Sequence, residues 1–327
     1  MSATGRSTRP SLTGHDPATY VAHMLHGADR AYRETNCYAD VIIELLHARG
    51  LEPLAAFGHL VRMDFEGDQW TFFKPPPEDL ERLFAVDIHE MQPYRPLPLQ
   101  IAEQLERDRT MIVELDSFHL PDTAATSYRT EHVKTSVAID LIEPNAERLH
   151  YFHGLGLYVL EGEDYRGVFR IGETLGTTLP PYAELVRFDA GQRPDGAQLR
   201  TAARELLAGH LARRPARNPF AAFAGQLDAV LPQLLGGELD AFHAYAFATV
   251  RMAGSAFEVL GDHASWLLGD HATEIVAGAH EIVDGCKALS FRLARRRAFD
   301  PQARLAGLAS AWDRVIAGLT EQVGRAG

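Results

Sequence analysis

The sequence predicts an α+β protein whose C-terminal part is entirely helical, and two patterns lead to this expectation. Residues 20–190 combine helical periodicity with short strand-like runs such as TMIVELDSF (110–118) and HVKTSVAIDLI (132–142). From about residue 195 onward, apolar residues recur at helical spacing and no convincing strand pattern appears. We therefore expect a disordered lead-in over residues 1–18, an α+β domain over 19–192 and a helical domain over 193–327.

The individual elements follow from local patterns. The first helix is predicted over residues 36–49, because apolar residues recur at every third or fourth position until Gly50 ends the run. Pro77, followed by two acidic residues, is typical of a helix start. Further helices are expected over about 77–84, 97–107, 195–213, 219–235, 238–260, 264–297 (with a break) and 302–324. Strands are expected over 110–118, 132–142 and 148–152, with GVFRI (167–171) and AELVRFD (183–189) as shorter candidates.

The composition is that of an ordinary globular chain, since 46% of the 327 residues are hydrophobic and 23% are charged. A formal net charge of −12 argues against general nucleic-acid binding. No apolar run reaches the roughly 18 residues of a membrane span, and the N-terminus lacks the apolar segment of a signal peptide. The two cysteines lie far apart in the sequence, which favours a reducing cytoplasm over a disulfide framework.

Basic residues are concentrated in two runs of the C-terminal half, HLARRPAR (210–217) and FRLARRRAF (291–299). The simpler interpretation is a pair of solvated helix ends, where cations interact favourably with the helix dipole. The alternative is a docking patch for an acidic partner.

Cys37 lies in the first turn of the first predicted helix, with Thr35 or Asn36 as the natural N-cap. The helix dipole and the unpaired N–H groups of a first turn stabilise an anion, so a thiol at this position is a better nucleophile. The same N–H groups, helped by Asn36, can receive an oxyanion that forms beside the sulfur. The alternative is a small buried apolar residue, because free cysteine is among the most buried residue types.

A cysteine nucleophile needs a base, and His132 is the best-placed histidine because it opens a strand downstream of the cysteine helix. The next strand ends at His153, which could orient His132 or act as the base itself. A cysteine on a helix, followed by a histidine on a strand and an orienting group on the next strand, is the chain order of papain-like folds. The sequence therefore predicts a papain-like antiparallel sheet with a cysteine-bearing helix. A purely structural role for either histidine is the alternative.

Several further residues are candidates for substrate binding. Asp116, at a strand end, could bind a substrate ammonium or cap the following turn. Trp70 could form an apolar wall at the mouth of the site. Arg251, Glu258 and Lys287 interrupt apolar helical patterns, so they either form an internal ion-pair network or line a substrate pocket. The repeated Gly-Asp-His-Ala in GDHASWLLGDHA (261–272) indicates helix boundaries, and we expect no metal site.

Long motifs of this chain resemble an uncharacterised bacterial family, a domain of unknown function, from about residue 20 to the C-terminus. They include ETNCYADVIIELLHARGLEP, VELDSFHLPDTAATSYRTEHVKTSVAID and FHAYAFATVRMAGSAFEVL. Genes of that family are expected beside stand-alone amino acid:carrier-protein ligases. The family is in turn distantly similar to the butirosin-type aminoacyl transferases, which have a papain-like, bacteriocin-peptidase-like fold. The shared pattern consists of Cys37, Asp116 through Pro121, and Tyr128 through His132.

This resemblance implies an acyltransferase that moves an aminoacyl group from a carrier-protein phosphopantetheine thioester to a small amine acceptor through a cysteine. The phosphopantetheine of the carrier protein would be the substrate arm, and no bound cofactor is expected. Neither nucleic acid nor a membrane is expected as a partner, and a homodimer is possible. The chain departs from the pattern at Thr135, where the relatives carry a second histidine, and at His153, where they carry aspartate. These departures leave open a Cys37–His132 dyad, a Cys37–His132–His153 triad, or a fold without activity. The alternatives are a cysteine hydrolase of amide bonds and a catalytically silent partner that binds a carrier protein.

Overall fold

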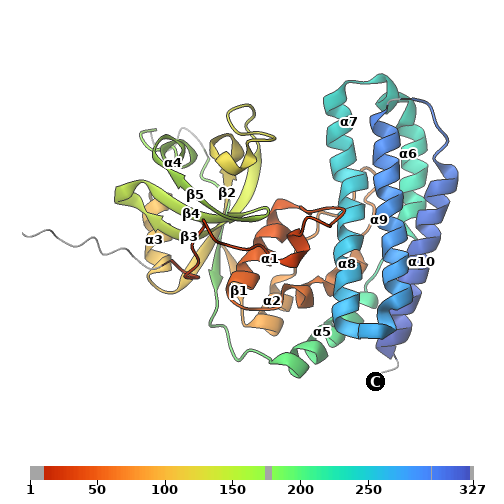
Figure 1. The fold of residues 1–327 in the computed structure, drawn as a ribbon, viewed down its shortest axis with the longest axis horizontal. Helices are drawn as coiled ribbons and strands as arrows, with labels where there is room; N and C mark the ends of the chain where they lie inside the picture. The colour runs from red at the N-terminus through yellow and green to blue at the C-terminus, as the bar shows by residue number, and fades with distance from the viewer. Residues whose placement is uncertain (1–10, 174–178, 296, 325–327) are drawn as a thin grey trace, which may run out of the picture. The chain divides into compact units, whose positions relative to one another are not determined.

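The computed structural model describes residues 11–173, 179–295 and 297–324. It confirms an α+β protein with an antiparallel sheet and a helical C-terminal region (Figure 1). The chain forms two compact units. The α+β unit contains the residues up to Met24, together with Cys37–Leu51 and Phe84–Gln192. The helical unit contains Leu25–Asn36, Glu52–Leu83 and the chain from Arg193 onward.

The α+β unit is built on one six-stranded sheet with the order β1-β6-β2-β3-β4-β5, in which all neighbours are antiparallel. The strands are β1 (Asp87–Met91), β2 (Arg109–Asp116), β3 (Lys134–Glu143), β4 (Arg148–His153), β5 (Gly156–Glu161) and β6 (Ala183–Arg187). Helix α1 (Cys37–Ala48) packs on β3 and β4. Helices α3 (Leu97–Leu105) and α4 (Gly162–Val168) belong to the same unit, and α3 packs on β2 and β3.

The central strand β3 is buried on both faces, and its alternating side chains serve two different cores. Val137 and Ile139 point into the cluster formed with α3 and α4, which also contains Tyr151 of β4. Ser136 and Ala138 point to the other face, where α1 lies. This arrangement explains why the middle of β3, residues 137–142, is apolar at every position except Asp140 instead of alternating.

Residues 11–18, which the sequence predicted as disordered, are ordered in the α+β unit; residues 1–10 of the predicted lead-in lie outside the described residues. The Leu12 N–H donates to the Asp140 carbonyl at 2.8 Å, and the Thr13 N–H and hydroxyl both donate to the Asp140 carboxylate. Asp140 is fully buried, and burial raises the pKa of its carboxyl. These hydrogen bonds hold the segment, because a buried carboxylate needs donors.

The helical unit confirms the helical C-terminal region. Its main helices are α2 (Pro77–Phe84), α5 (Gly196–Leu211), α6 (Pro219–Gly236), α7 (Leu239–Ala246), α8 (Met252–Leu268), α9 (Thr273–Ala294) and α10 (Gln302–Gly324). The break predicted within 264–297 falls at the turn Gly269–Ala272, where Gly269 has a φ of +57°. Residues 52–83 join this unit because the 3₁₀ segment η2 (Pro53–Arg62) packs on α5 and α8.

The structure differs from the sequence prediction at further places. GVFRI was predicted as a strand, but Val168 ends helix α4 and Arg170 is left-handed with a φ of +52°. Strands β1 and β5 were not predicted; their few residues alternate weakly and are fixed by pairing with β6 and β4. The predicted helix over 238–260 is interrupted by a π-helical turn, η6 (Phe247–Arg251). In the described part of the chain, no helix has the length and apolar character needed to cross a membrane.

Candidate functional site

Cys37 is the first residue of α1 and is partly exposed. The buried side of α1, which includes Val41, Ile42 and Leu45, fixes the helix on the sheet and so fixes the position of its first turn. The Cys37 thiol donates to the hydroxyl oxygen of Ser136 on β3 across 3.7 Å. The predicted position of the cysteine at a helix start is therefore present, and its immediate neighbour is a serine.

Charged side chains lie on the same face of the sheet as Ser136. Glu114 on β2 is the cross-strand partner of Ser136, and Asp116 is the partner of Lys134. Directly opposed residues of antiparallel strands point to the same face, so these side chains share the face on which Cys37 lies. The Lys134 ammonium donates to the Glu114 carboxylate at 2.6 Å.

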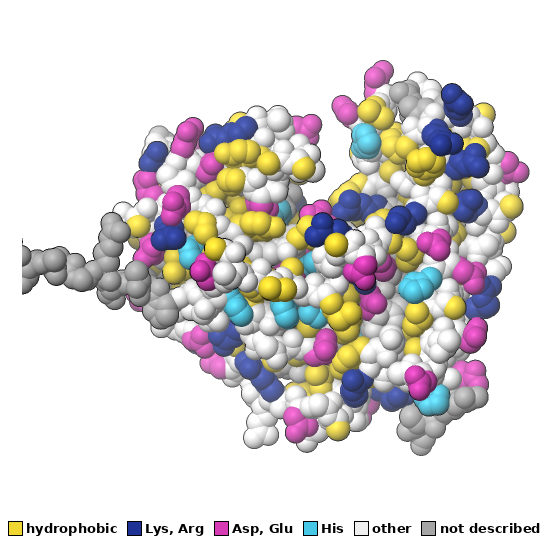
Figure 2. Space-filling model, in the orientation of Figure 1, with side chains coloured by type: hydrophobic (Ala, Val, Ile, Leu, Met, Phe, Trp, Pro, Cys, Tyr) yellow, Lys and Arg dark blue, Asp and Glu magenta, His cyan; other side chains and the backbone are white. Residues whose placement is uncertain are grey.

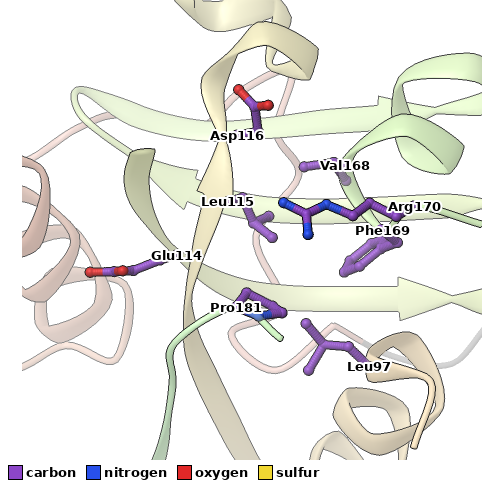
Figure 3. A pocket seen from close by; sticks show the side chains of 8 residues that line it. All are labelled: Leu97, Glu114, Leu115, Asp116, Val168, Phe169, Arg170 and Pro181. Atoms are coloured by element: carbon purple, nitrogen blue, oxygen red, sulfur yellow. The ribbon is translucent and has the colours of Figure 1, made fainter. Parts of the chain in front are cut away.

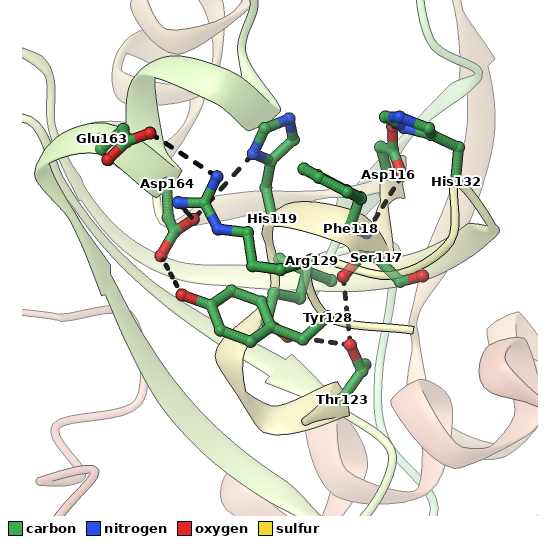
Figure 4. Close-up of polar contacts among 11 residues, drawn as sticks. Asp116, Ser117, Phe118, His119, Thr123, Tyr128, Arg129, His132, Glu163 and Asp164 are labelled. Atoms are coloured by element: carbon green, nitrogen blue, oxygen red, sulfur yellow. Dashed lines mark hydrogen bonds and ion pairs between the residues drawn. The ribbon is translucent and has the colours of Figure 1, made fainter. Parts of the chain in front are cut away.

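His132 is held by Asp116 at the end of this row (Figure 4). Its Nδ1–H donates to the Asp116 carboxylate at 2.6 Å, and its ring stacks on Phe118 with centroids 4.4 Å apart. The His132 side chain is 71% exposed, so its Nε2 faces solvent. A carboxylate on Nδ1 fixes the tautomer that leaves Nε2 able to accept a proton, as a general base requires.

The predicted triad of Cys37, His132 and His153 is not formed among the described residues. His132 precedes the start of β3 at Lys134 and lies four residues from Ser136, which contacts Cys37. Four residues of extended chain span roughly 13 Å. His132 and Cys37 therefore lie on one face without a direct contact. The side chain that contacts the Cys37 sulfur is Ser136.

His153 lies on the opposite face of the sheet. Its Nδ1–H donates to the Asp122 carboxylate at 2.5 Å, and its Nε2 accepts from the Thr135 hydroxyl at 2.7 Å. Thr135 directly precedes Ser136 on β3, so the two side chains point to opposite faces. Tyr151 also donates to Asp122, and burial, followed by the nearby carboxylate, raises the pKa of its phenol. Both ring nitrogens of His153 are engaged in this network, so it does not orient His132.

The loop between β2 and β3 is fastened to α4 by polar contacts (Figure 4). The Arg129 guanidinium donates to the Asp164 carboxylate at 2.5 Å, and the Tyr128 hydroxyl donates to the other oxygen at 2.9 Å. Arg129 has a φ of +58°, an uncommon conformation that these contacts support. His119 lies so close to α4 that a Cβ at Gly167 would be 2.3 Å from its ring. The loop that carries Asp116 and His132 is thereby held in one shape.

A pocket of about 380 Å³, including its open mouth, adjoins Asp116 (Figure 3). Leu97, Val168 and Phe169 give it apolar walls. The Arg170 guanidinium points toward β2 beside Leu115, whereas the Glu114 carboxylate points away from it.

The remaining predicted site residues of the N-terminal half lie in the helical unit. Thr35 and Asn36 are buried, and the Asn36 side-chain N–H donates to the Phe73 carbonyl at 3.1 Å. Trp70 was expected as the wall of a site, but it is 2% exposed and its ring packs against Phe220, 4.7 Å between centroids. Trp70 is therefore a core residue, because an aromatic side chain of that size is most stable where both faces are covered.

The three charged candidates of the C-terminal helices have different surroundings. Glu258 is buried and accepts the N–H groups of Ala31 and Tyr32, each at 2.8 Å. This is the internal network that the sequence left as one alternative. The Arg251 guanidinium donates to the Glu34 carbonyl at 3.1 Å, and Lys287 is exposed on α9.

Sequence reasoning missed Ser136 and Glu114. The only available signal was the alternation along β2 and β3, which places Glu114 with Asp116 and Ser136 with Lys134. Without the strand register, nothing connects those positions to Cys37. Among residues 11–173, 179–295 and 297–324, no group of three or more His, Cys, Asp or Glu side chains is arranged to hold a metal ion.

Comparison with protein families matches nearly the whole chain. Residues 21–188 match the DUF1839 N-terminal domain, and residues 196–321 match the DUF1839 C-terminal domain. The chain belongs to the DUF1839 family. No curated protein matches it. The two DUF1839 matches meet close to residue 192, whereas the compact units of the structure interleave in the sequence before Phe84.

Proposed function

We propose that this DUF1839 protein is a cysteine-dependent acyltransferase. Cys37 takes an aminoacyl group from the phosphopantetheine thioester of a carrier protein and passes it to an amine acceptor, in the biosynthesis of a small peptide-like metabolite. The observation that carries the proposal is the partly exposed Cys37 thiol at the start of α1, on the sheet face that ends in the Asp116–His132 pair. The resemblance to butirosin-type transferases supports the same assignment, and a papain-like fold is part of the proposal.

The first step is thioester exchange. The Cys37 thiolate attacks the acyl carbonyl, a new sulfur–acyl bond forms, and the bond to the pantetheine sulfur breaks. The pantetheine thiolate leaves and takes up a proton. Cys37 lies in the first turn of α1, and a thiolate attacks a thioester readily at neutral pH.

The second step forms the amide. The acceptor enters as an ammonium and must lose a proton before its nitrogen attacks the Cys37 thioester, after which Cys37 leaves as a thiolate. Asp116 supplies a carboxylate that binds the ammonium, and the exposed Nε2 of His132 supplies the base that takes its proton. In this scheme His132 serves the acceptor and has no contact with the sulfur. A reducing cytoplasm belongs to the proposal, because Cys37 must remain a free thiol.

One observation favours a second candidate function, a catalytically silent protein that binds a carrier protein. Cys37 contacts the hydroxyl of Ser136, and a serine cannot deprotonate a thiol at neutral pH. A cysteine without an imidazole partner fits a fold that has kept its shape and lost its activity.

Intact-mass measurement after incubation with an aminoacylated carrier protein tests the proposal. We expect one aminoacyl adduct on the wild type and on Cys286→Ala, and none on Cys37→Ala. Cys286 is the matched control, since it is the second cysteine of the chain and is fully buried. Added primary amines should discharge the adduct of the wild type faster than that of His132→Ala.

Other outcomes select other functions. Absence of an adduct, together with undiminished carrier binding by Cys37→Ala, would establish the silent partner. An adduct that water discharges at the same rate with and without amines would establish a hydrolase.

A further inference from the structure

A cluster of aromatic and cationic side chains, exposed except for the half-buried Arg251, lies on the helical unit, and we call it the aromatic–arginine patch. It consists of Phe247, Arg251, Lys287, Phe291 and Arg295. The rings of Phe247 and Phe291 are 48% and 59% exposed. Each ring carries a guanidinium: Arg251 lies 5.4 Å from the Phe247 centroid, and Arg295 lies 4.4 Å from that of Phe291.

The two halves of the patch are neighbours in space. Helices α8 and α9 form a hairpin through the turn Gly269–Ala272, and the π-helical turn η6 that precedes α8 packs on α9. Arg251 and Phe291 lie about equally far along the chain from that turn, so they stand at the same level of the hairpin. Figure 2 shows Lys and Arg side chains beside hydrophobic ones over the end of the helical bundle at which α9 stops.

Folding does not explain these side chains. Two large aromatic rings gain little stability when half of their surface stays in water, and contiguous exposed apolar area usually marks an interaction site. Lys287, Phe291 and Arg295 recur at four-residue spacing on α9, so they form one stripe on its solvent face. The π-helical turn that carries Phe247 and Arg251 is a type of distortion that often lies at functional sites.

The charge of the patch indicates the chemistry of its partner. The chain has a formal net charge of −12, yet this area gathers Arg251, Lys287 and Arg295, with Arg292 also exposed on α9. One acidic side chain is paired with the patch, since the Glu34 carboxylate lies 3.6 Å from the Arg251 guanidinium. A local cationic area on an acidic chain favours an acidic partner by charge complementarity.

A protein surface fits this area better than a nucleic acid does. Nucleic acids would be repelled by the net charge of the chain as a whole. Single-stranded bases stack on open aromatic faces, but one face of each ring, Phe247 and Phe291, already carries a guanidinium group. Aromatic and arginine side chains together are typical of protein–protein hot spots.

We propose that the aromatic–arginine patch is the docking site for an acidic face of the carrier protein that delivers the acyl group. This inference rests on the proposed function for the identity of the partner. The arginines and Lys287 pair with Asp and Glu side chains of the carrier, and the two phenylalanines bury their exposed edges against apolar residues between them.

A binding experiment without chemistry tests the docking site. The probe is a fluorescently labelled holo acyl carrier protein of net negative charge, and anisotropy is recorded at low and at physiological salt. Phe291→Ala and Arg295→Glu should each weaken binding at least tenfold. The matched control is Arg314→Glu, which makes the same charge change at an exposed residue of α10. Arg314 pairs with Glu281, and Glu281 lies about 15 Å from Phe291 along α9.

The same measurement can overturn the inference. If Arg295→Glu and Lys287→Glu both bind the carrier as Arg314→Glu does, the patch is not the docking site. Duplex DNA that binds as tightly as the carrier, and is weakened equally by Arg295→Glu, would assign the patch to nucleic acid instead.

A loading experiment separates the failure of the docking site from the failure of the proposed function. An aminoacyl N-acetylcysteamine thioester has the same reactive group as the carrier but no protein surface. Patch variants should load Cys37 from this small thioester as fast as the wild type does. From the carrier they should load it at a tenth of the wild-type rate or less. If patch variants load from the carrier as fast as the wild type does, the docking site is refuted and the acyltransferase proposal still stands. If the wild type loads from neither donor, the acyltransferase fails, and the anisotropy result alone then decides whether the patch binds the carrier.

Discussion

Two buried histidines of the helical unit should make its stability fall steeply as the pH falls. The Nδ1–H of His59 donates to the Ala56 carbonyl at 2.9 Å, and that of His263 donates to the Leu54 carbonyl at 2.7 Å. The Nε2 atom of each ring is buried without a hydrogen-bond partner. Protonation would place a cation in that apolar setting, so burial lowers the pKa of His59 and of His263 to about 4.

The size of the effect follows from linkage. In the unfolded chain both imidazoles bind a proton below about pH 6.5, whereas in the folded unit they stay neutral down to about pH 4. The unfolded state therefore binds more protons throughout this window, and stability is lost as the pH falls through it. Between pH 7.5 and pH 5 each histidine should cost about 2 kcal/mol of unfolding free energy, or about 4 kcal/mol for the pair.

Urea denaturation followed by tryptophan fluorescence measures this loss. The three tryptophans of the chain, Trp70, Trp266 and Trp312, all belong to the helical unit, so the signal reports that unit alone. The double variant His59→Gln, His263→Gln keeps an N–H donor at each position and removes the imidazoles. Its unfolding free energy should lie below that of the wild type at pH 7.5 and should change far less between pH 7.5 and pH 5.

The exposed residue His271 provides the control, since His271→Gln should leave the pH profile of the wild type unchanged. His210, whose Nε2 lies 2.7 Å from a carboxylate oxygen of Asp79, is kept in every variant. If the double variant loses as much stability on acidification as the wild type, the buried histidines do not cause the loss, and the reasoning fails.

Three further predictions follow from buried groups. In the native protein iodoacetamide should alkylate Cys37 alone, since burial raises the pKa of Cys286 to about 12. In urea both cysteines should react. Rapid labelling of Cys286 in the native protein would contradict its burial. Glu258→Ala should lower the unfolding free energy measured by urea denaturation by about 2–5 kcal/mol, because two backbone N–H groups lose their acceptor. Glu258→Gln should recover part of that loss. His153→Ala should speed hydrogen exchange of β3 and β4, because the Thr135 hydroxyl and one oxygen of the Asp122 carboxylate lose their partner, while Cys37 alkylation keeps its wild-type rate. Slower alkylation would show that His153 acts on the cysteine after all.

Local sequence patterns were sufficient to place most helices. The 3.6-residue periodicity of 36–49 becomes α1 at Cys37–Ala48, and Cys37 lies in its first turn, as predicted. The helical C-terminal region follows equally from periodicity, and Gly269 provides the predicted break. These predictions succeed because helix formation depends on side chains three and four residues apart in one segment.

The candidate site was predicted only in part, because its composition depends on strand register. A one-residue shift along β3 exchanges Thr135 for Ser136 on the face of Cys37, and nothing in the strand itself selects between them. His153 was placed near His132 from chain order, but pairing with β3 points it to the other face. Likewise, the burial of Trp70 depends on α6, more than a hundred residues later in the chain.

The sequence by itself therefore determined most of the helical segments, that Cys37 lies at the start of one of them, and that the C-terminal region is helical, because these properties are set within single segments. Only the tertiary structure decided that Ser136 meets the cysteine, that His132 pairs with Asp116, and that His153 turns away. Those contacts join residues far apart in sequence, and strand pairing and core packing bring them together.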